Sequence, residues 1–319
     1  MIATKAGGAL GAALPPTPPR AAVLVSGAST GVGYSTAVRL ARAGFIVFAG
    51  VRRDADAQTL VREAGPDVTP IVLDVTDAES VARAAQTIAA RCDAKLLGLV
   101  NNAGTALTGP LELLPLDEMR RQFEVNFFGA IALVQAFAPI LRATHGRIVN
   151  VSAVGGKLAS PFVGAYAASK FALEAASDAL RVELRAFGVH VAVVEPGAVK
   201  SPLWERGADV SLKALETVEP SRREPYDETI RRIVRLSQRN ANHGMPPERV
   251  AEAIAHALVA PKPHARYVVG TDAHIALAIA RMPEAIRDRL AAAAIGVPAK
   301  GPNLPTRRIT RRSSVRVTT

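Results

Sequence analysis

The chain has 319 residues, of which 49% are hydrophobic, enough to bury the core of one large α/β domain or two small ones. A single cysteine excludes a disulfide framework and a thiolate metal site, and the six histidines show none of the spacings of a zinc site. Much of the formal net charge of +11 lies in residues 299–319, which hold six basic residues and no acid. We therefore expect a basic tail and no nucleic-acid partner, with binding of that tail to a nucleic acid or an anionic surface as the alternative.

The two ends of the chain are expected to lie outside the fold. Residues 1–19 contain four prolines and no apolar core typical of a signal peptide, and no run of 18 apolar residues predicts a membrane span. The longest apolar stretch, Phe127 to Leu141, predicts a buried helix. We expect an N-terminal extension over 1–19, one domain over 20–298, a disordered tail over 299–319, and a cytoplasmic protein.

The first elements are a buried strand over 21–26, a glycine-rich turn, and a helix over 34–43. Strand, turn and helix in this order predict a phosphate cradle, because glycines let the backbone approach a pyrophosphate at the helix N-terminus. The candidate residues are Gly27, Ser29, Thr30, Gly31, Val32 and Gly33. The G-x-S-x-G nucleophile elbow of hydrolases also matches residues 27–31, but it is not expected after a first strand and leaves Gly33 without a role.

A second strand over 45–50 leads into Arg52 and Arg53. An acid at this place would bind a ribose 2′-hydroxyl, whereas an arginine accommodates a 2′-phosphate. The pair therefore favours NADP over NAD as the cofactor, and the alternative is that both arginines simply face water.

Two further strands end in polar residues. A strand over 71–75 ends at Asp74 and Val75 and precedes a helix over 77–91, and a strand over 96–100 runs into Asn102, Ala103 and Gly104. A helical pattern over 117–141 has Asn126 in its middle. Asparagine is a poor residue inside a helix, so we expect Asn126 to have a local function.

A strand over 146–151 is followed by Ser152 and by a helix over 165–187 that carries Tyr166 and Lys170. These two residues are four apart and share one face of the helix. An ammonium nearby favours the phenolate, so we expect Lys170 to lower the pKa of Tyr166 toward neutrality. Ser152 is placed to donate a hydrogen bond to a carbonyl oxygen. In isolation, the same spacing is also typical of a half-buried tyrosine beside a solvated lysine.

The last third of the chain is less regular. A strand over 189–194 ends near Pro196 and Gly197, and Val199 and Ser201 follow as further cofactor-binding candidates. Residues 198–247 are polar and predicted to be irregular, with a helical patch over 227–238, and form the expected substrate lid. A helix starts at residue 247, and a strand covers 266–269. The apolar segment 273–296 predicts a packed terminal helix, with a pocket wall or a peripheral membrane contact as alternatives.

Seven strands alternate with helices, which predicts a single-domain, doubly wound, parallel sheet of Rossmann type. Each motif named above falls at the carboxyl end of a strand, where such sheets bind ligands. This convergence carries the functional interpretation.

The ordered set of motifs resembles the short-chain dehydrogenase/reductase family over about residues 21–270. The residues that carry the resemblance are Gly27, Gly31, Gly33, Asp74, Asn102, Ala103, Gly104, Asn126, Ser152, Tyr166, Lys170, Pro196 and Gly197. Beyond residue 270 the chain is similar to the retinol and hydroxysteroid dehydrogenase branch. Ser26 and Ser201 stand where the family often has threonine, and both keep the hydroxyl.

The resemblance implies alcohol–carbonyl chemistry with a nicotinamide cofactor. It gives Tyr166 as the acid/base, Ser152 as the residue that orients the carbonyl, and Lys170 as a ligand of the nicotinamide ribose. It also implies that Asn126 holds a water in the proton relay, that Asp74 contacts adenine, and that the Asn102 segment flanks the nicotinamide.

The sequence thus predicts an NADP-dependent oxidoreductase for a hydrophobic alcohol or ketone of steroid, retinoid or lipid type. The alternative is a cofactor-binding regulatory protein without turnover. By analogy with proteins of this fold, we expect a homodimer or homotetramer that assembles through the helices over 117–141 and 165–187.

Overall fold

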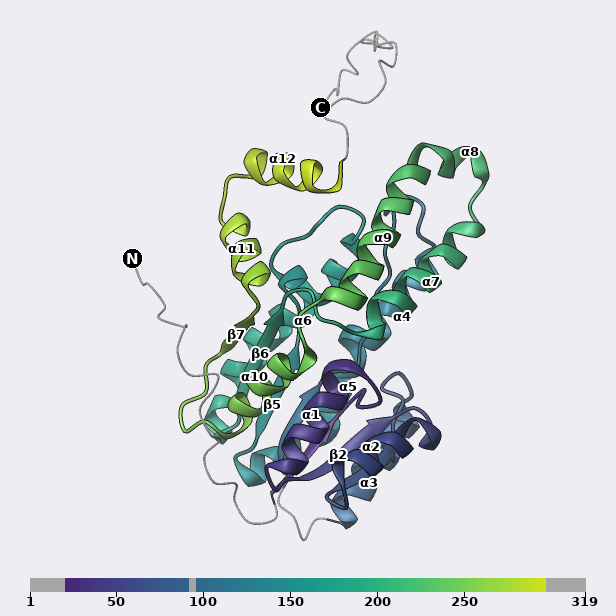
Figure 1. Ribbon diagram of the computed structural model, residues 1–319. Helices are drawn as coiled ribbons and strands as arrows, with labels where there is room; N and C mark the ends of the chain where they lie inside the picture. The colour runs from purple at the N-terminus through teal and green to yellow at the C-terminus, as the bar shows by residue number, and fades with distance from the viewer. Residues whose placement is uncertain (1–20, 92–95, 297–319) are drawn as a thin grey trace, which may run out of the picture.

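The computed structural model describes residues 21–91 and 96–296. Seven strands form one parallel sheet in the order β3-β2-β1-β4-β5-β6-β7, which confirms the predicted fold class (Figure 1). Their bounds are β1 (Ala22–Val25), β2 (Ile46–Val51), β3 (Val68–Val72), β4 (Leu96–Asn101), β5 (Arg147–Val151), β6 (His190–Pro196) and β7 (Arg266–Val269).

The central strand β1 shows why these segments are strands. All four of its residues are apolar and buried, which is typical of a parallel strand covered on both faces. Val25 at its carboxyl end is in register with Ala49 of β2 and Val100 of β4. Because the chain leaves β1 for β2 on one side and reaches β4 on the other, the sheet has its ligand-binding crevice beyond the carboxyl end of β1.

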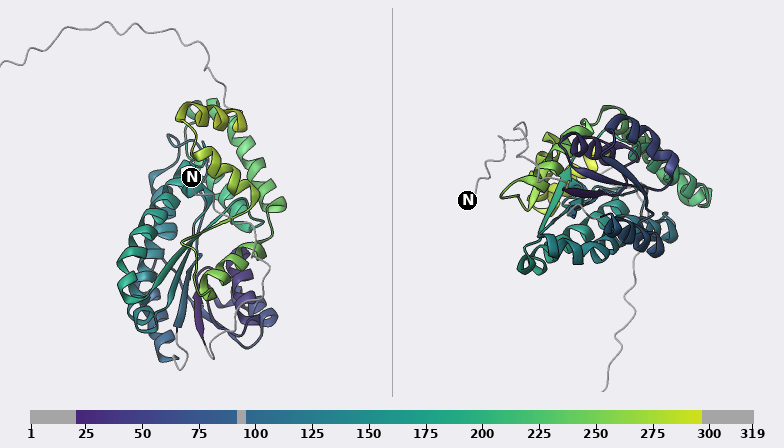
Figure 2. Two further views of the ribbon diagram at one scale, coloured as in Figure 1. Left: turned by 90° about the vertical axis from the view of Figure 1, so that its left-hand side faces the viewer. Right: turned by 90° about the horizontal axis from the view of Figure 1, so that it is seen from below.

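Helices cover both faces of the sheet (Figure 2). One core cluster joins the sheet to α1 and α10, and the other joins it to α3, α5 and α6. The helices are α1 (Gly31–Arg42), α2 (Gln58–Ala64), α3 (Ala78–Ala90), α4 (Leu116–Phe123), α5 (Gly129–Thr144), α6 (Gly164–Glu183), α7 (Pro202–Glu216), α8 (Pro220–Arg223), α9 (Asp227–His243), α10 (Pro247–Val259), α11 (Thr271–Ala280) and α12 (Glu284–Ile295).

The helix predicted over 117–141 is present but interrupted. A π-helical turn, η2 (Glu124–Phe128), separates α4 from α5, and Asn126 lies at its centre. The continuous stretch Leu116–Thr144 is long and apolar enough to cross a membrane by length and composition. Leu133, Phe137 and Leu141 of this stretch are buried in the core against the sheet, as in the core helix of a soluble α/β protein.

Residues 198–247 are not irregular, so that prediction was wrong, although the helical patch expected over 227–238 is confirmed as part of α9. They form a helical hairpin of α7 and α9, joined by α8 and a short 3₁₀ turn, η5 (Glu224–Tyr226). Its two ends meet where Val199 bridges Met245, and Met245 N donates to Ala198 O over 2.9 Å. The hairpin therefore leaves the sheet and returns to it at one point.

The segment over 273–296 is two helices rather than one. Pro283 precedes α12 and lacks the amide hydrogen needed to continue α11. Ile275, Ile286 and Leu290 are exposed, so this segment packs less than expected. Two smaller differences are α2, which was not predicted, and β3, which begins three residues before the predicted strand. The predicted extension over 1–19 and basic tail over 299–319 lie outside the described residues.

Candidate active site

The glycine turn between β1 and α1 has a backbone that a ligand can approach closely. Gly27 and Gly31 have φ angles of +64° and +58°, in the left-handed region that favours glycine. A Cβ on Gly33 would collide with the carbonyl oxygen of Gly27. Thr30 caps α1 without a side-chain hydrogen bond, and the first turn of α1 contains no acid. The helix N-terminus thus keeps free N–H groups and its positive dipole, which fit a pyrophosphate.

The turn is held from β4 by Ser26 and Asn102. The Nδ2 atom of Asn102 donates to Ser26 O over 2.9 Å and to Gly27 O over 3.1 Å. Ser26 Oγ accepts from Asn102 N over 3.0 Å and from Ala103 N over 3.1 Å. The Asn102 side chain therefore braces the cradle, a function that the sequence did not predict. Ser26 is likewise a site residue that the sequence analysis did not propose.

Two arginines follow β2, and they differ in the partners that their side chains have. Arg53 donates from Nη2 to Asp56 over 2.9 Å, whereas Arg52 is exposed and forms no ion pair with the side chains that the structure describes, which do not include that of Asp54. Asp74, one strand away, accepts from Thr76 N over 2.9 Å and from Thr76 Oγ1 over 2.7 Å, with Val75 buried beside it. Arg52 thus offers an exposed cation beside the cradle, which fits a 2′-phosphate.

Tyr166 and Lys170 lie on α6 and are both buried. The Nζ atom of Lys170 donates to Val151 O over 2.9 Å and lies 5.9 Å from the centre of the Tyr166 ring. Burial raises the pKa of Tyr166 above its usual range. Burial also lowers the pKa of Lys170 to about 8, against the opposing effect of the Glu174 charge. The pKa of Tyr166 therefore does not move toward neutrality as expected, because burial is the largest effect on it.

Ser152 follows β5 and has a buried hydroxyl without a hydrogen-bond partner among the described residues. The adjoining turn is η3 (Val154–Gly156). A Cβ on Gly156 would lie 2.8 Å from Ser152 Oγ, and one on Gly155 would lie 3.6 Å from the Tyr166 ring. Ser152 and Tyr166 thus border one short turn, and an orphaned hydroxyl there is a donor available to a ligand.

Asn126 has the local function that its position in a helix predicts. Its Oδ1 accepts from Thr105 N over 2.8 Å, and its Nδ2 donates to Thr105 O and to Ser169 Oγ, each over 2.9 Å. A Cβ on Gly104 would lie 3.4 Å from Asn126 Oδ1 and 3.9 Å from Lys170 Nζ. The π-helical turn therefore brings Asn126 beside Lys170. Thr105 and Ser169 were missed, since small polar residues give no distinct sequence signal.

The start of the hairpin lies over the site. The ring of Trp204 on α7 lies 5.9 Å from that of Tyr166. Ser201 caps α7, and its Oγ lies 2.8 Å from where a Cβ on Gly31 would stand. Before it, Gly197 is packed against Asp272, whose carboxylate accepts from Ala198 N over 2.7 Å. Asp272 comes from the first turn of α11, far along the chain, and no motif predicted it.

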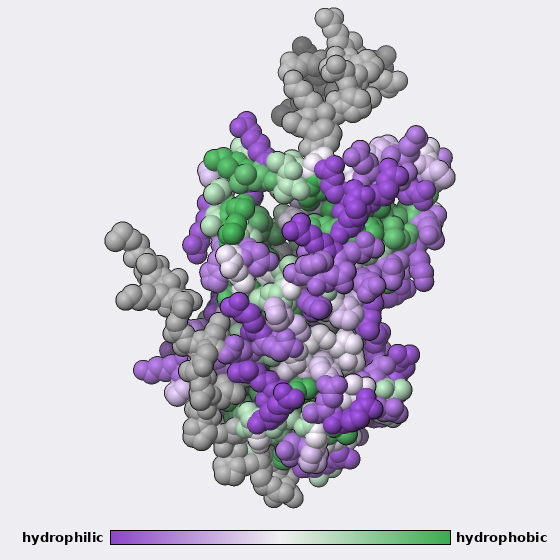
Figure 3. Space-filling model, in the orientation of Figure 1, coloured by the Kyte–Doolittle hydropathy of each residue, from purple (hydrophilic) through white to green (hydrophobic). Residues whose placement is uncertain are grey.

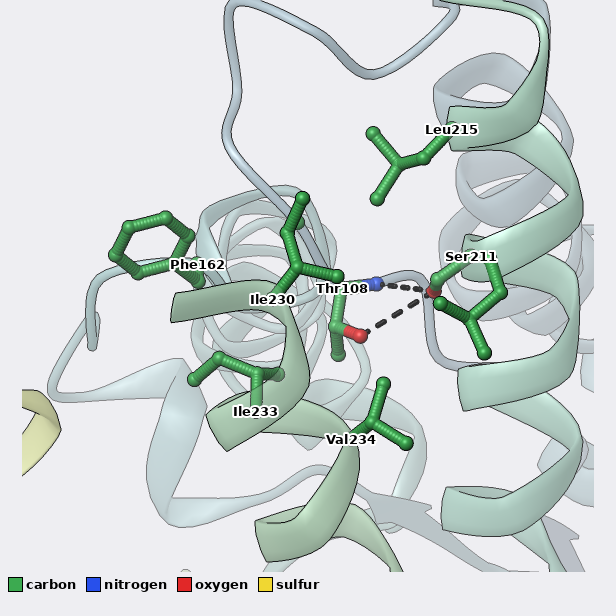
Figure 4. Close-up of a pocket in the computed structure, with 9 residues that line it drawn as sticks. Thr108, Phe162, Ser211, Leu215, Ile230, Ile233 and Val234 are labelled. Carbon is green, nitrogen blue, oxygen red and sulfur yellow. Dashed lines mark hydrogen bonds between the residues drawn. The ribbon is translucent and has the colours of Figure 1, made fainter. Parts of the chain in front are cut away.

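A small pocket lies under the hairpin, with mostly apolar side chains facing it from α7 and α9 (Figure 4). Thr108 and Ser211 form its polar side. The Ser211 hydroxyl accepts a hydrogen bond from Thr108 N over 2.8 Å. Phe162 closes one end and has a φ of +65°, a strained value for a residue with a side chain. The lining residues are Thr108, Gly109, Phe162, Ser211, Leu212, Leu215, Ile230, Ile233 and Val234.

No group of three or more His, Cys, Asp or Glu side chains is arranged to hold a metal ion within residues 21–91 and 96–296. The candidate site itself carries the Ser152 hydroxyl, the Tyr166 phenol, the Asn126 amide and the Lys170 ammonium.

Comparison with known proteins agrees with this geometry. Residues 21–209 match the family model described as short chain dehydrogenase. "Uncharacterized oxidoreductase YbbO" of Escherichia coli (strain K12) is 37% identical over 248 residues, 77% of this chain and 84% of that protein. "Retinol dehydrogenase 5" of Mus musculus is 35% identical over 260 residues, 79% of this chain and 81% of that protein.

A solved structure gives the same result. The crystal structure of a short chain dehydrogenase from Burkholderia cenocepacia J2315 in complex with NADP superposes with a TM-score of 0.65. It is 26% identical and covers 85% of this chain and 98% of its own. The chain therefore belongs to the short chain dehydrogenase family of oxidoreductases, close to its retinol dehydrogenase branch.

Proposed function

We propose that the protein interconverts a hydrophobic alcohol and its carbonyl compound with NADP as cofactor, and NAD as the alternative. The cofactor, when bound, supplies or accepts the hydride. The free N–H groups at the start of α1 would hold the pyrophosphate, and Arg52 would hold the 2′-phosphate. Asp74 with Val75 would border the adenine, and Ala103, Gly104, Pro196, Gly197, Val199 and Ser201 would border the rest of the cofactor.

Ser152 and Tyr166 act on the reacting oxygen. The orphaned Ser152 hydroxyl donates a hydrogen bond to the substrate oxygen and orients it. Tyr166 donates its phenolic proton to that oxygen during reduction and takes the proton back during oxidation. Because burial raises the pKa of Tyr166, the phenol keeps its proton at neutral pH and can donate it to a carbonyl oxygen.

Lys170 and Asn126 support this proton transfer. The Lys170 ammonium, held by Val151 O, binds the ribose of the cofactor and stabilises negative charge that develops on Tyr166. Asn126 is fixed by three hydrogen bonds and positions the relay that returns a proton toward Lys170 and Tyr166.

The hydrophobic character of the substrate is supported by the hairpin. Trp204 lies over Tyr166, and the pocket between α7 and α9 is lined mostly by aliphatic side chains. Residues 198–247 are proposed to act as the lid over such a substrate, of steroid, retinoid or lipid type. The relatives named above are oxidoreductases, which does not favour a non-catalytic cofactor-binding protein.

The observation that carries the proposal is the unpartnered Ser152 hydroxyl beside the buried Tyr166. Tyr166→Phe removes only the phenolic hydroxyl and with it the transferable proton, so we expect turnover of ketones with NADPH to fall by about 10²–10⁴-fold. Tyr34→Phe is the matched control, because Tyr34 lies on α1 and bonds Glu63 away from the site. Both variants should keep a thermal shift with NADP. Turnover by Tyr166→Phe within about tenfold of the wild type would refute the assignment.

The partners and location of the enzyme are also proposals. Exposed apolar residues on the outer helices support self-association, and those on α11 and α12 support a peripheral membrane contact (Figure 3). The single cysteine, Cys92, is compatible with a reducing compartment, which supports a cytoplasmic location.

A further inference from the structure

Behind the site lies a buried ion cluster that the proposed reaction does not use. It joins Glu174 and Asp178 of α6, Glu195 of β6, Arg266 of β7 and Lys157 after η3. Glu174 and Glu195 are 3% and 1% exposed. Buried charges are costly unless they are paired, so these two buried carboxylates beside a catalytic helix, with their three partly exposed partners, call for a function.

Glu174 is the member nearest to the site. It follows Lys170 by four residues, about 6 Å along the helix axis and on the same face. A Cβ on Gly156 would lie 2.8 Å from Ser152 Oγ, 3.0 Å from Glu174 Cγ and 3.1 Å from Lys170 O. The Glu174 side chain therefore lies next to the same glycine as the Ser152 hydroxyl and the Lys170 backbone carbonyl.

The two oxygens of the Glu174 carboxylate have different surroundings. Oε2 accepts from Lys157 Nζ over 2.8 Å and lies 3.2 Å from Arg266 Nη2. Oε1 is buried and has no hydrogen-bond partner among the described residues. Oε2 is thus paired with two cations, whereas Oε1 is not. The negative charge near Oε1 acts through the low-dielectric interior of the protein, in which Lys170 also lies.

We propose that Glu174 is a positioning residue whose buried negative charge keeps the Lys170 ammonium protonated and whose ion pair with Lys157 holds the Ser152 turn against α6. Glu174 touches neither substrate nor cofactor and acts through Lys170. The inference rests on the proposed function, since it assigns the electrostatic support of the same site.

The charges around Lys170 agree with this assignment. Burial lowers the pKa of Lys170 to about 8, and Glu174 is the charge that opposes this effect. Burial, and then the charge of Glu174, raises the pKa of Glu195 to about 7, against Lys157 and Arg266. Asp178 pairs with Arg266 and Arg181 and lies two turns from Lys170, about 12 Å along the axis. Glu174 is thus the carboxylate on α6 best placed to support the ammonium.

The test is the pH profile of kcat for ketone reduction by Glu174→Gln. Without the Glu174 charge, the pKa of Lys170 should fall further below about 8. The alkaline limb of the profile, where activity is lost as the pH rises, should therefore move to lower pH. We expect a shift of roughly one pH unit, the size typical of losing a nearby opposite charge. Glu174→Asp keeps the charge and should restore most of the profile.

Two other variants make the test specific. Asp178→Asn removes a carboxylate that shares Arg266 but lies farther from Lys170, so its profile should stay that of the wild type. Lys157→Gln removes a cation from Glu174 and should move the alkaline limb to higher pH, the opposite direction. This variant also tests the proposal if Glu174→Gln fails to fold, because Lys157 is partly exposed.

A readout that is independent of turnover is the titration of the Lys170 ammonium by ¹⁵N NMR, with Lys170→Arg to assign the signal. The midpoint should be lower in Glu174→Gln than in the wild type. An unchanged midpoint or pH profile in a folded Glu174→Gln protein, or an equal shift in Asp178→Asn, would overturn the proposal and leave the cluster a structural one. The proposed function would stand in that case, because its own test is the loss of activity in Tyr166→Phe.

Discussion

Arg52 and Arg53 are neighbours in the chain but differ in what holds them. Arg53 makes two hydrogen bonds to Asp56, over 2.9 and 3.2 Å, whereas Arg52 is exposed and pairs with none of the described side chains. We expect Arg52→Asp to weaken NADP binding by about 10–100-fold, as hydrogen bonds to a charged group contribute about 1.5–3 kcal/mol. NAD binding should change little, because NAD has no 2′-phosphate.

Calorimetric titration of both cofactors measures this difference. Arg53→Asp should have the smaller effect, and Arg62→Asp on the exposed face of α2 is the control for a change of surface charge. Equal weakening of NADP and NAD by Arg52→Asp would contradict a 2′-phosphate contact.

Some properties of these single residues could be predicted from the sequence, and others could not. The four-residue spacing of Tyr166 and Lys170 correctly predicted a shared helix face, because helix geometry is local. The direction of the Tyr166 pKa was not predictable, because it depends on burial by Ala106, Ala153 and Trp204, which come from three other segments. The same holds for Ser26, whose bonds to residues 102 and 103 arise only when β1 pairs with β4.

At the scale of elements, the π-helical turn η2 determines where Asn126 points. Asn126→Ala removes one acceptor and two donors and leaves the Thr105 backbone and the Ser169 hydroxyl without these partners. We expect a loss of about 1–3 kcal/mol in the free energy of unfolding, the typical cost of unsatisfied buried groups. Denaturant unfolding measures it, and Asn242→Ala, an exposed asparagine of α9, is the control.

The activity of Asn126→Ala should fall together with its stability, since Asn126 lies beside Lys170. If the variant unfolds at the wild-type denaturant concentration, the hydrogen bonds to Thr105 and Ser169 do not stabilise the π-helical turn.

The sheet and its flanking helices were predictable because strands such as Ala22–Val25 are continuously apolar and the helices have one apolar face. The hairpin of α7 and α9 was not fully predictable. In α9 the buried Ile230, Ile233 and Ser237 leave a narrow apolar stripe among arginines, and α7 contains Gly207, which disfavours a helix by about 1 kcal/mol. Gly207 is tolerated because a Cβ there would press on Ala106, so this helix is fixed by packing rather than by propensity.

At the scale of the whole molecule, two exposed apolar regions lie on different helices. One region is formed by η2 and α6, where Phe128, Phe171 and Val182 are 51%, 42% and 71% exposed. The hydrogen bond between Asn126 and Ser169 holds η2 against α6, the two elements that carry these exposed side chains. The other region is formed by α11 and α12, whose apolar surface is seen in Figure 3.

The proposed homodimer would bury the first region. A double variant, Phe171→Glu with Val182→Glu, places two like charges on each protomer and four at a two-fold interface, where their repulsion and desolvation oppose association. We expect the wild type to elute as a dimer or tetramer and the double variant as a monomer, measured by light scattering coupled to size exclusion. Ile286→Glu with Leu290→Glu on α12 is the matched control, because it adds the same charges to the other region. If this control becomes monomeric and the α6 variant does not, association uses α12, and the face formed by η2 and α6 is not the interface.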